Sequence, residues 1–149
     1  MTDVSNDGER SLAQAAAVLS DTQGLIDRAL AALRSKTLEG DRVSPAKLDG
    51  YQLVSYELSL CWAECSAASF LLAHAGHLEQ EMPNAAGFTT RLATLFCAEA
   101  VTNSAARLRA RPTDFGLSEV DISAVTSGDN GAAFLAAQLA AGNIAGIGQ

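Results

Sequence analysis

Apolar residues recur at helical spacing through the first quarter of the chain. Between Glu9 and Lys36 each of them lies three or four residues from another, which is the spacing of one helix face. The positions are Leu12, Ala16, Leu19, Leu25, Ile26, Ala29, Leu30 and Leu33. This pattern predicts a first helix from about Glu9 to Lys36. Gly24 lies in its middle and leaves open a division into two shorter helices, because glycine disfavours a helix interior.

A second and longer helical pattern runs from about Pro45 to about Glu81. Ser44 and Pro45 are typical of a helix start, with serine at the cap and proline in the first turn, while Gly50 leaves a later start open. Two apolar stripes adjoin along it: one of Leu53, Leu60, Ala67 and Leu71, the other of Val54, Leu58, Cys61, Cys65, Ala68 and Leu72. Together they are wider than a single amphipathic stripe, so we expect neighbours on more than one side of this helix.

A third helix is predicted from about Ala85 or Phe88 to Ala110. The Met82-Pro83-Asn84 sequence interrupts the pattern before it, and Arg111-Pro112 ends it, since the residue before a proline avoids helical backbone.

Two short helices are predicted after the third. Ser118 and Asp121 have the spacing of a capping box for a helix over 119–125. A last helix would start at a cap formed by Asp129 or Asn130 and end near Ala141, with Gly142 just after its end. No segment alternates as a strand would. The sequence therefore predicts an all-α fold, an up-down bundle of three long helices plus two short C-terminal helices. Residues 9–142 would form a single helical domain between a flexible tail over 1–8 and a C-terminal tail over 143–149.

Composition narrows the class of protein. Of the 149 residues 48% are hydrophobic and 18% charged, as in a globular domain. The net charge of −7 gives an acidic surface that repels phosphate backbones, so we expect no nucleic-acid partner. We also expect no membrane span, because the chain starts polar and lacks a long uninterrupted apolar run. Three cysteines without framework spacing indicate reduced thiols and a cytoplasmic location.

Candidate chemistry gathers on the second helix. Glu57 and Glu64 lie among its apolar residues with Cys61 between them. Together with Glu99 of the third helix they would line an inward pocket for a small molecule or metal in a free-standing homodimer. The alternative is structural: these glutamates would meet an arginine of a neighbouring helix, such as Arg91 or Arg107. Cys61, Cys65 and Cys97 are interpreted as small buried hydrophobic residues.

No catalytic, cofactor-binding or metal-binding residue is predicted. His74, His77 and Glu81 have the spacing of a metal-binding helix face, but they lie near a helix end, where histidine commonly serves the dipole. No phosphate-binding glycine loop or nucleophile motif occurs. Trp62 is interpreted as an anchor in the core or at an interface, and the interface candidates are Trp62, Tyr56, Leu60 and Phe70.

Two stretches carry a resemblance to a known family. The first is LDGYQLVSYELSLCWAECSAASFLL, with Leu48-Asp49 before the long helix and Gln52 soon after. The second is RPTDFGLSEVDISAV, which follows the third helix and contains Pro112, Asp114, Phe115, Gly116 and Leu117. From about Ser20 to Ala141 the chain resembles the N-terminal helical extension of methylsuccinyl-CoA dehydrogenases, flavin enzymes of the acyl-CoA dehydrogenase superfamily.

The resemblance implies a role without catalysis in this chain. Family members bind FAD and acyl-CoA, and carry their catalytic glutamate, in a part that has no counterpart here. Glu57, Glu64 and Glu99 therefore inherit no catalytic role. The resemblance implies a helical module or small partner subunit that covers an oligomer surface or bounds the acyl-CoA pocket. FAD would enter only through a flavoenzyme partner, and self-association is the other interaction expected.

Overall fold

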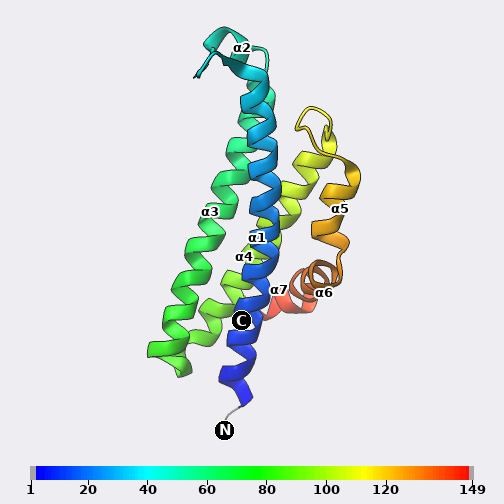
Figure 1. Cartoon of the computed structure of the whole chain (residues 1–149). Coiled ribbons are helices and arrows are strands. Elements are labelled where there is room, and N and C mark those ends of the chain that lie inside the picture. The colour runs from blue at the N-terminus through cyan, green and yellow to red at the C-terminus, as the bar shows by residue number, and fades with distance from the viewer. Residues whose placement is uncertain (1–2, 148–149) are drawn as a thin grey trace.

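The computed structural model describes residues 3–147, with side chains from Asp7 onward. The predicted all-α bundle is confirmed over this range. Three long helices, α1 (Asp3–Thr37), α3 (Gln52–Glu81) and α4 (Pro83–Ala110), run up and down beside one another. Figure 1 shows α3 on one flank of the α1–α4 pair and the short C-terminal helices on the other. The three long helices therefore form the frame on which the short helices pack.

Helix α1 is longer than the sequence predicted. It begins at Asp3, so residues 3–8 are helical rather than the predicted tail, while Met1 and Thr2 lie outside the described residues. Asp7 and Glu9 in its first turns interact favourably with the positive end of the helix dipole. The helix also continues through Gly24 without a break, because Leu25 and Ile26 beside it are buried in the core. Tertiary packing outweighs the low helix propensity of one glycine.

The predicted second helix is divided near its start. A short helix, α2 (Pro45–Asp49), is followed by a break at Gly50 and Tyr51, and α3 begins at Gln52. The later start that Gly50 left open is therefore the correct one. The segment between α1 and α2 contains a small antiparallel hairpin with two residues in each strand. Its strands are β1 (Leu38–Glu39) and β2 (Arg42–Val43). Gly40 makes its turn with a φ of 61°, a conformation that glycine adopts without strain.

The loop between α4 and α5 (Glu119–Ser127) is held by its own apolar residues. Phe115 and Leu117 insert into the core, and Phe115 is only 1% exposed. Gly116 between them has a φ of 67°, and a Cβ at this position would lie 2.6 Å from the Cβ of Ala32 in α1. Both the backbone conformation and the close approach to α1 require glycine here. The PTDFGL sequence thus has a structural explanation as an anchored turn.

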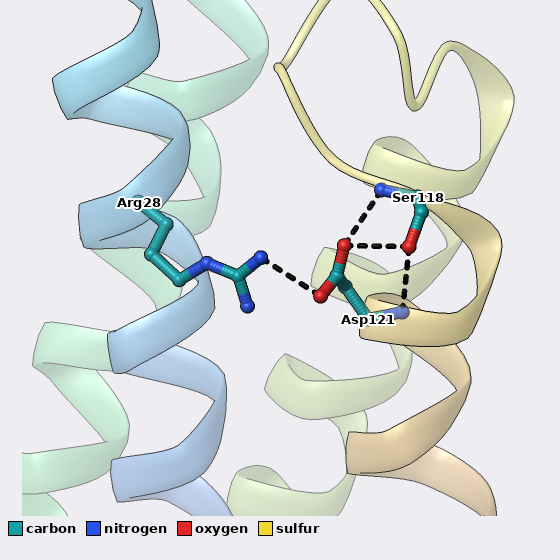
Figure 2. A network of polar contacts seen from close by, with 3 residues as sticks. All are labelled: Arg28, Ser118 and Asp121. Atoms are coloured by element: carbon teal, nitrogen blue, oxygen red, sulfur yellow. Dashed lines mark hydrogen bonds and ion pairs between the residues drawn. The ribbon is translucent and has the colours of Figure 1, made fainter.

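Helix α5 begins with the predicted capping box. The Ser118 hydroxyl accepts from the Asp121 backbone N–H, and the Asp121 carboxylate accepts from the Ser118 N–H at 2.8 Å. Figure 2 shows that Arg28 reaches across from α1 to the same carboxylate, with Nη2 2.8 Å from Oδ1. The Ser118 hydroxyl also donates to this carboxylate at 2.6 Å. The hydrogen bonds hold the pKa of Asp121 well below its ordinary value, and the bond from the Ser118 hydroxyl contributes most. One side chain therefore both caps α5 and ties it to α1.

The C-terminal part differs from the prediction. Three short helices follow the loop instead of two: α5, α6 (Asp129–Gln138) and α7 (Ala141–Ile147). The cap of α6 is Gly128 rather than Asp129 or Asn130, and Gly142 lies inside α7. Residues 143–147 are thus helical instead of a tail, and 148–149 lie outside the described range. Gln138 connects the elements, because Thr94 of α4 donates to its side chain at 3.0 Å and Asn143 of α7 donates to its backbone carbonyl.

Candidate functional site

The core-facing side of α3 follows one of the two predicted stripes. All members of this stripe are buried, namely Val54, Leu58, Cys61, Cys65, Ala68 and Leu72. The other stripe is not covered: Leu53 and Ala67 are exposed, and Leu60 and Leu71 are half-buried. The prediction of neighbours on more than one side holds for α1 and α4. The remaining side of α3 faces no other element of the described chain.

Glu57 and Glu64 meet Arg107 of α4. The guanidinium lies 3.3 Å from Glu57 Oε2 and 3.0 Å from Glu64 Oε1, and all three side chains are less than one-third exposed. Burial lowers the pKa of Arg107, but the hydrogen bonds and charges of the two carboxylates outweigh it, and the pKa is raised overall. The structural interpretation of the two glutamates is therefore correct for Arg107, and their charges are used to join α3 to α4.

The four residues of the alternative pocket are brought together only in part, because Glu57 and Glu64 meet at Arg107 and Cys61 lies near them. Glu99 is exposed on α4, whereas Cys61 is fully buried in the core. Within residues 7–147 no three histidine, cysteine, aspartate or glutamate side chains are placed to hold a metal ion. His74, His77 and Glu81 are all exposed near the C-terminal end of α3. The arrangement therefore pairs Glu57 and Glu64 with Arg107 and leaves Glu99 at the surface.

The three cysteines lie in the core as predicted. Cys65 Sγ is 3.6 Å from the Ser104 hydroxyl, and Cys97 Sγ donates to the Ala15 carbonyl at 3.5 Å. Burial raises the pKa of Cys61 to about 11 and of Cys97 to about 12, and raises that of Cys65 as well. Because the thiolate is the reactive form, none of them is poised as a nucleophile.

One buried carboxylate was missed by the sequence analysis. Glu79 is 9% exposed and accepts a hydrogen bond of 2.6 Å from the Thr90 hydroxyl of α4. The backbone of α1 packs against it at Gly8, where a Cβ would lie 2.5 Å from Glu79 Oε1. The signal was present, since Glu79 continues the buried stripe from Leu72 and Ala75 at intervals of three and four. Its position between three helices indicates a structural role.

An uncovered row of residues runs along the outer side of α3. We call this row the outer face: Leu53, Tyr56, Leu60, Ala63, Ala67, Phe70, His74 and His77. Tyr56 is 60% exposed and Phe70 78% exposed, while Leu60 lies half-buried at one edge. No member of the row is charged, in a chain of net charge −7. The predicted interface residues Tyr56, Leu60 and Phe70 therefore lie together.

Trp62 lies away from the other interface candidates. It is 59% exposed, and it lines a small cavity of about 190 Å³ with Gln23, Ile26 and Asp27 of α1. Successive residues are turned by about 100° around a helix axis, which separates Trp62 from Ala63 on the outer face. Trp62 is thus neither a core anchor nor part of the outer face.

A larger surface groove lies between α4 and α6. It has a volume of about 470 Å³ and is lined mostly by alanine and leucine side chains, with Arg109 and Thr126 among its lining residues. Arg109 is already paired with Glu119, its Nε 2.7 Å from the carboxylate. The groove therefore offers apolar contact without a free charge to orient a ligand.

Helix α3 also meets the simplest test for a membrane span. Its 30 residues reach a mean hydropathy of 1.2 in their most apolar window, of which 33% is buried within the protein. Core helices of water-soluble proteins meet the same test of length and composition. The buried third of this window is the side of α3 that packs on α1 and α4. The outer face belongs to the exposed part of the same helix.

No family model, curated protein or solved structure matches this chain.

Proposed function

We propose that this chain is a non-catalytic helical module that docks within a larger protein assembly through the outer face of α3. The resemblance of its sequence suggests the assembly: an acyl-CoA dehydrogenase-like flavoenzyme that carries FAD and acyl-CoA in its own residues. In this proposal the chain is a detached extension or small partner subunit and contributes surface rather than chemistry.

One observation carries the proposal: the exposed outer face of α3, from Leu53 to His77, is largely apolar and contains no Asp, Glu, Lys or Arg. Two large aromatic side chains on it, Tyr56 and Phe70, are more than half exposed. Contiguous exposed apolar residues of this kind mark interaction surfaces in soluble proteins. Tyrosine and phenylalanine are also typical of the centres of protein–protein interfaces.

The structural roles of the acidic and thiol groups also support the proposal. Glu57 and Glu64 share Arg107, Glu79 accepts from Thr90, and the cysteines are buried with raised pKa values. Groups that serve acid–base or nucleophilic chemistry are found in a cleft, within reach of a substrate. Here these groups join helices, which favours a docking role over the alternative of a ligand-binding homodimer.

The test is recovery of flavin with the tagged chain from its own cells. A stoichiometric, yellow, FAD-containing partner whose flavin is bleached by an acyl-CoA supports the proposal. The Phe70→Glu variant should recover less flavin, because it places a charge on the outer face. The Val120→Glu variant is the matched control, since Val120 is 79% exposed on α5. A colourless preparation, or equal recovery with Phe70→Glu, counts against the proposal, and turnover by the isolated chain refutes it.

A further inference from the structure

We propose that the outer face of α3 pairs with the same face of a second copy of this chain, with the two helices antiparallel. This inference deepens the proposed function by naming the occupant of the docking surface, and it rests on that proposal for its biological setting. The paired modules would then be the unit that the assembly holds, so that loss of pairing through Phe70 also lowers the recovery of flavin.

The spacing of the outer face is that of a helix–helix seam. Its eight members follow one another at alternating intervals of three and four residues from Leu53 to His77. A mean repeat of 3.5 residues keeps one side of a helix against a partner helix over several turns. The face extends over 24 residue steps, about 36 Å at ~1.5 Å per residue. No helix of the described chain packs on the outer face.

The outer face is complementary to the outer face of a second copy that runs in the opposite direction. A two-fold axis at the level of Cys65 places Ala63 opposite Ala67 of the second copy and Leu60 opposite Phe70, since each pair of numbers sums to 130. The same axis places Tyr56 opposite His74 and Leu53 opposite His77. Small residues lie at the centre, where two helix backbones approach closely, and large ones lie further out. Every member of the outer face thus finds a partner that is also a member, as a two-fold interface requires.

Charge and area are consistent with a second copy. The outer face contains no Asp, Glu, Lys or Arg, and the carboxylates beside it, Glu57 and Glu64, share Arg107, which leaves one net negative charge per copy there. A strip about 36 Å long and about 10 Å wide covers roughly 400 Å² per copy, or about 800 Å² in total, which is smaller than a stable specific interface of about 1,200 Å² or more and is that of a weak, reversible one. We therefore expect micromolar self-association. Higher salt should strengthen it by screening the −7 charges of the two chains.

Light scattering during size-exclusion chromatography, over a concentration series, tests the pairing. The wild-type chain should approach twice its mass of 15.4 kDa, and Ala63→Glu should weaken association at least about 100-fold, because it adds two like charges beside the axis. Ala63 is exposed, so circular dichroism should show unchanged helix content. Val120→Glu should remain dimeric.

Cross-linking tests the direction of pairing. The native thiols are buried, so Tyr56→Cys and His74→Cys each introduce the single exposed thiol of its chain. A mixture of the two variants should form a disulfide under mild oxidation. Neither variant alone should, because positions 56 of the two copies are about 27 Å apart along the antiparallel helices at ~1.5 Å per residue. Efficient cross-linking of each variant with itself refutes the antiparallel arrangement.

A wild-type chain that stays monomeric at its highest soluble concentration overturns the second-copy proposal. If that monomer binds phosphatidylcholine vesicles through Phe70, the occupant is a lipid surface. If it retains the FAD protein through Phe70, the second copy is wrong while the proposed function stands. A dimer that recovers no flavin leaves the pairing intact and removes the proposed function.

Discussion

The two flanks of the α1–α4 pair are treated differently by the same chain. On one flank, α5–α7 cover the pair and are fastened by directed polar contacts, including Arg28 to Asp121 and Thr94 to Gln138. On the other, α3 packs its inner side with alanine, cysteine and leucine, is joined to α4 by the ion pairs of Arg107 with Glu57 and Glu64, and leaves its outer face uncovered. A chain that fastens both flanks with specific contacts yet leaves Tyr56 and Phe70 exposed on one of them separates stability from interaction. Phe115 and Phe70 represent the two roles.

The largest effect is expected at Phe115. Its side chain is 1% exposed, so Phe115→Ala removes a filled core volume and should lower the free energy of unfolding by about 3–5 kcal/mol. Urea unfolding followed by circular dichroism measures this loss. A change below about 1 kcal/mol would contradict the assignment of the PTDFGL turn as a core anchor.

The next effect is expected at the joint between α3 and α4. Arg107→Met should destabilise the protein by about 2 kcal/mol, because it leaves two partly buried carboxylates without their shared cation. The triple variant Glu57→Gln, Glu64→Gln, Arg107→Met is the control. Thermal unfolding should show that the triple variant recovers much of the loss, and an equal loss in both would mean that packing, rather than charge, explains the effect.

A smaller effect is expected at the start of α5. Ser118→Ala removes the cap and should cost about 1 kcal/mol. Asp121 has a lowered pKa in the folded state, so its contribution is present above its ordinary pKa and is lost as the pH falls through the folded value. Unfolding curves should therefore show that the contribution of the Asp121 carboxylate to the free energy of unfolding is unchanged from neutral pH to about pH 5. It should decrease only in strong acid. A loss already complete at pH 5 would contradict the capping role of the carboxylate.

The smallest effect on stability is expected at Phe70. Its side chain is 78% exposed, so Phe70→Ala should change the free energy of unfolding of the monomer by no more than about 0.5 kcal/mol. The measurement is urea unfolding at a dilution where the chain is monomeric. A loss as large as that of Phe115→Ala would show that both aromatic residues serve the core, and the contrast between the flanks would disappear.

Local signals predicted much of this fold. Apolar periodicity located the three long helices, because a helix that packs on a core must repeat its buried side, and Ser118 with Asp121 predicted a cap that depends only on neighbouring residues. The continuity of α1 through Gly24 was not predictable in this way, since it depends on the burial of Leu25 and Ile26 against other helices. Helix α7 has no charged residue and no buried side chain, so its sequence carries little pattern.

The candidate site was predictable only in part. The pairing of Glu57 and Glu64 with an arginine followed from the cost of placing carboxylates among apolar residues, but the choice of Arg107 over Arg91 depends on how α4 aligns with α3. Glu99 was grouped with them because it lies among apolar residues, and its exposure reflects which side of α4 meets α3. Trp62 was grouped with Phe70 by residue type, although the turn of the helix separates them.

The contacts between the two ends of the chain have a consequence for synthesis on the ribosome. Helix α1 is made first, yet Arg28 and Lys36 find their partners Asp121 and the Asp114 carbonyl only after more than a hundred residues have been translated. Until then the apolar side of α1 and α4 that α5–α7 later cover is exposed to solvent, where chaperones can bind it. Truncated products that end before α5 should accordingly be recovered with chaperones to a greater extent than the whole chain.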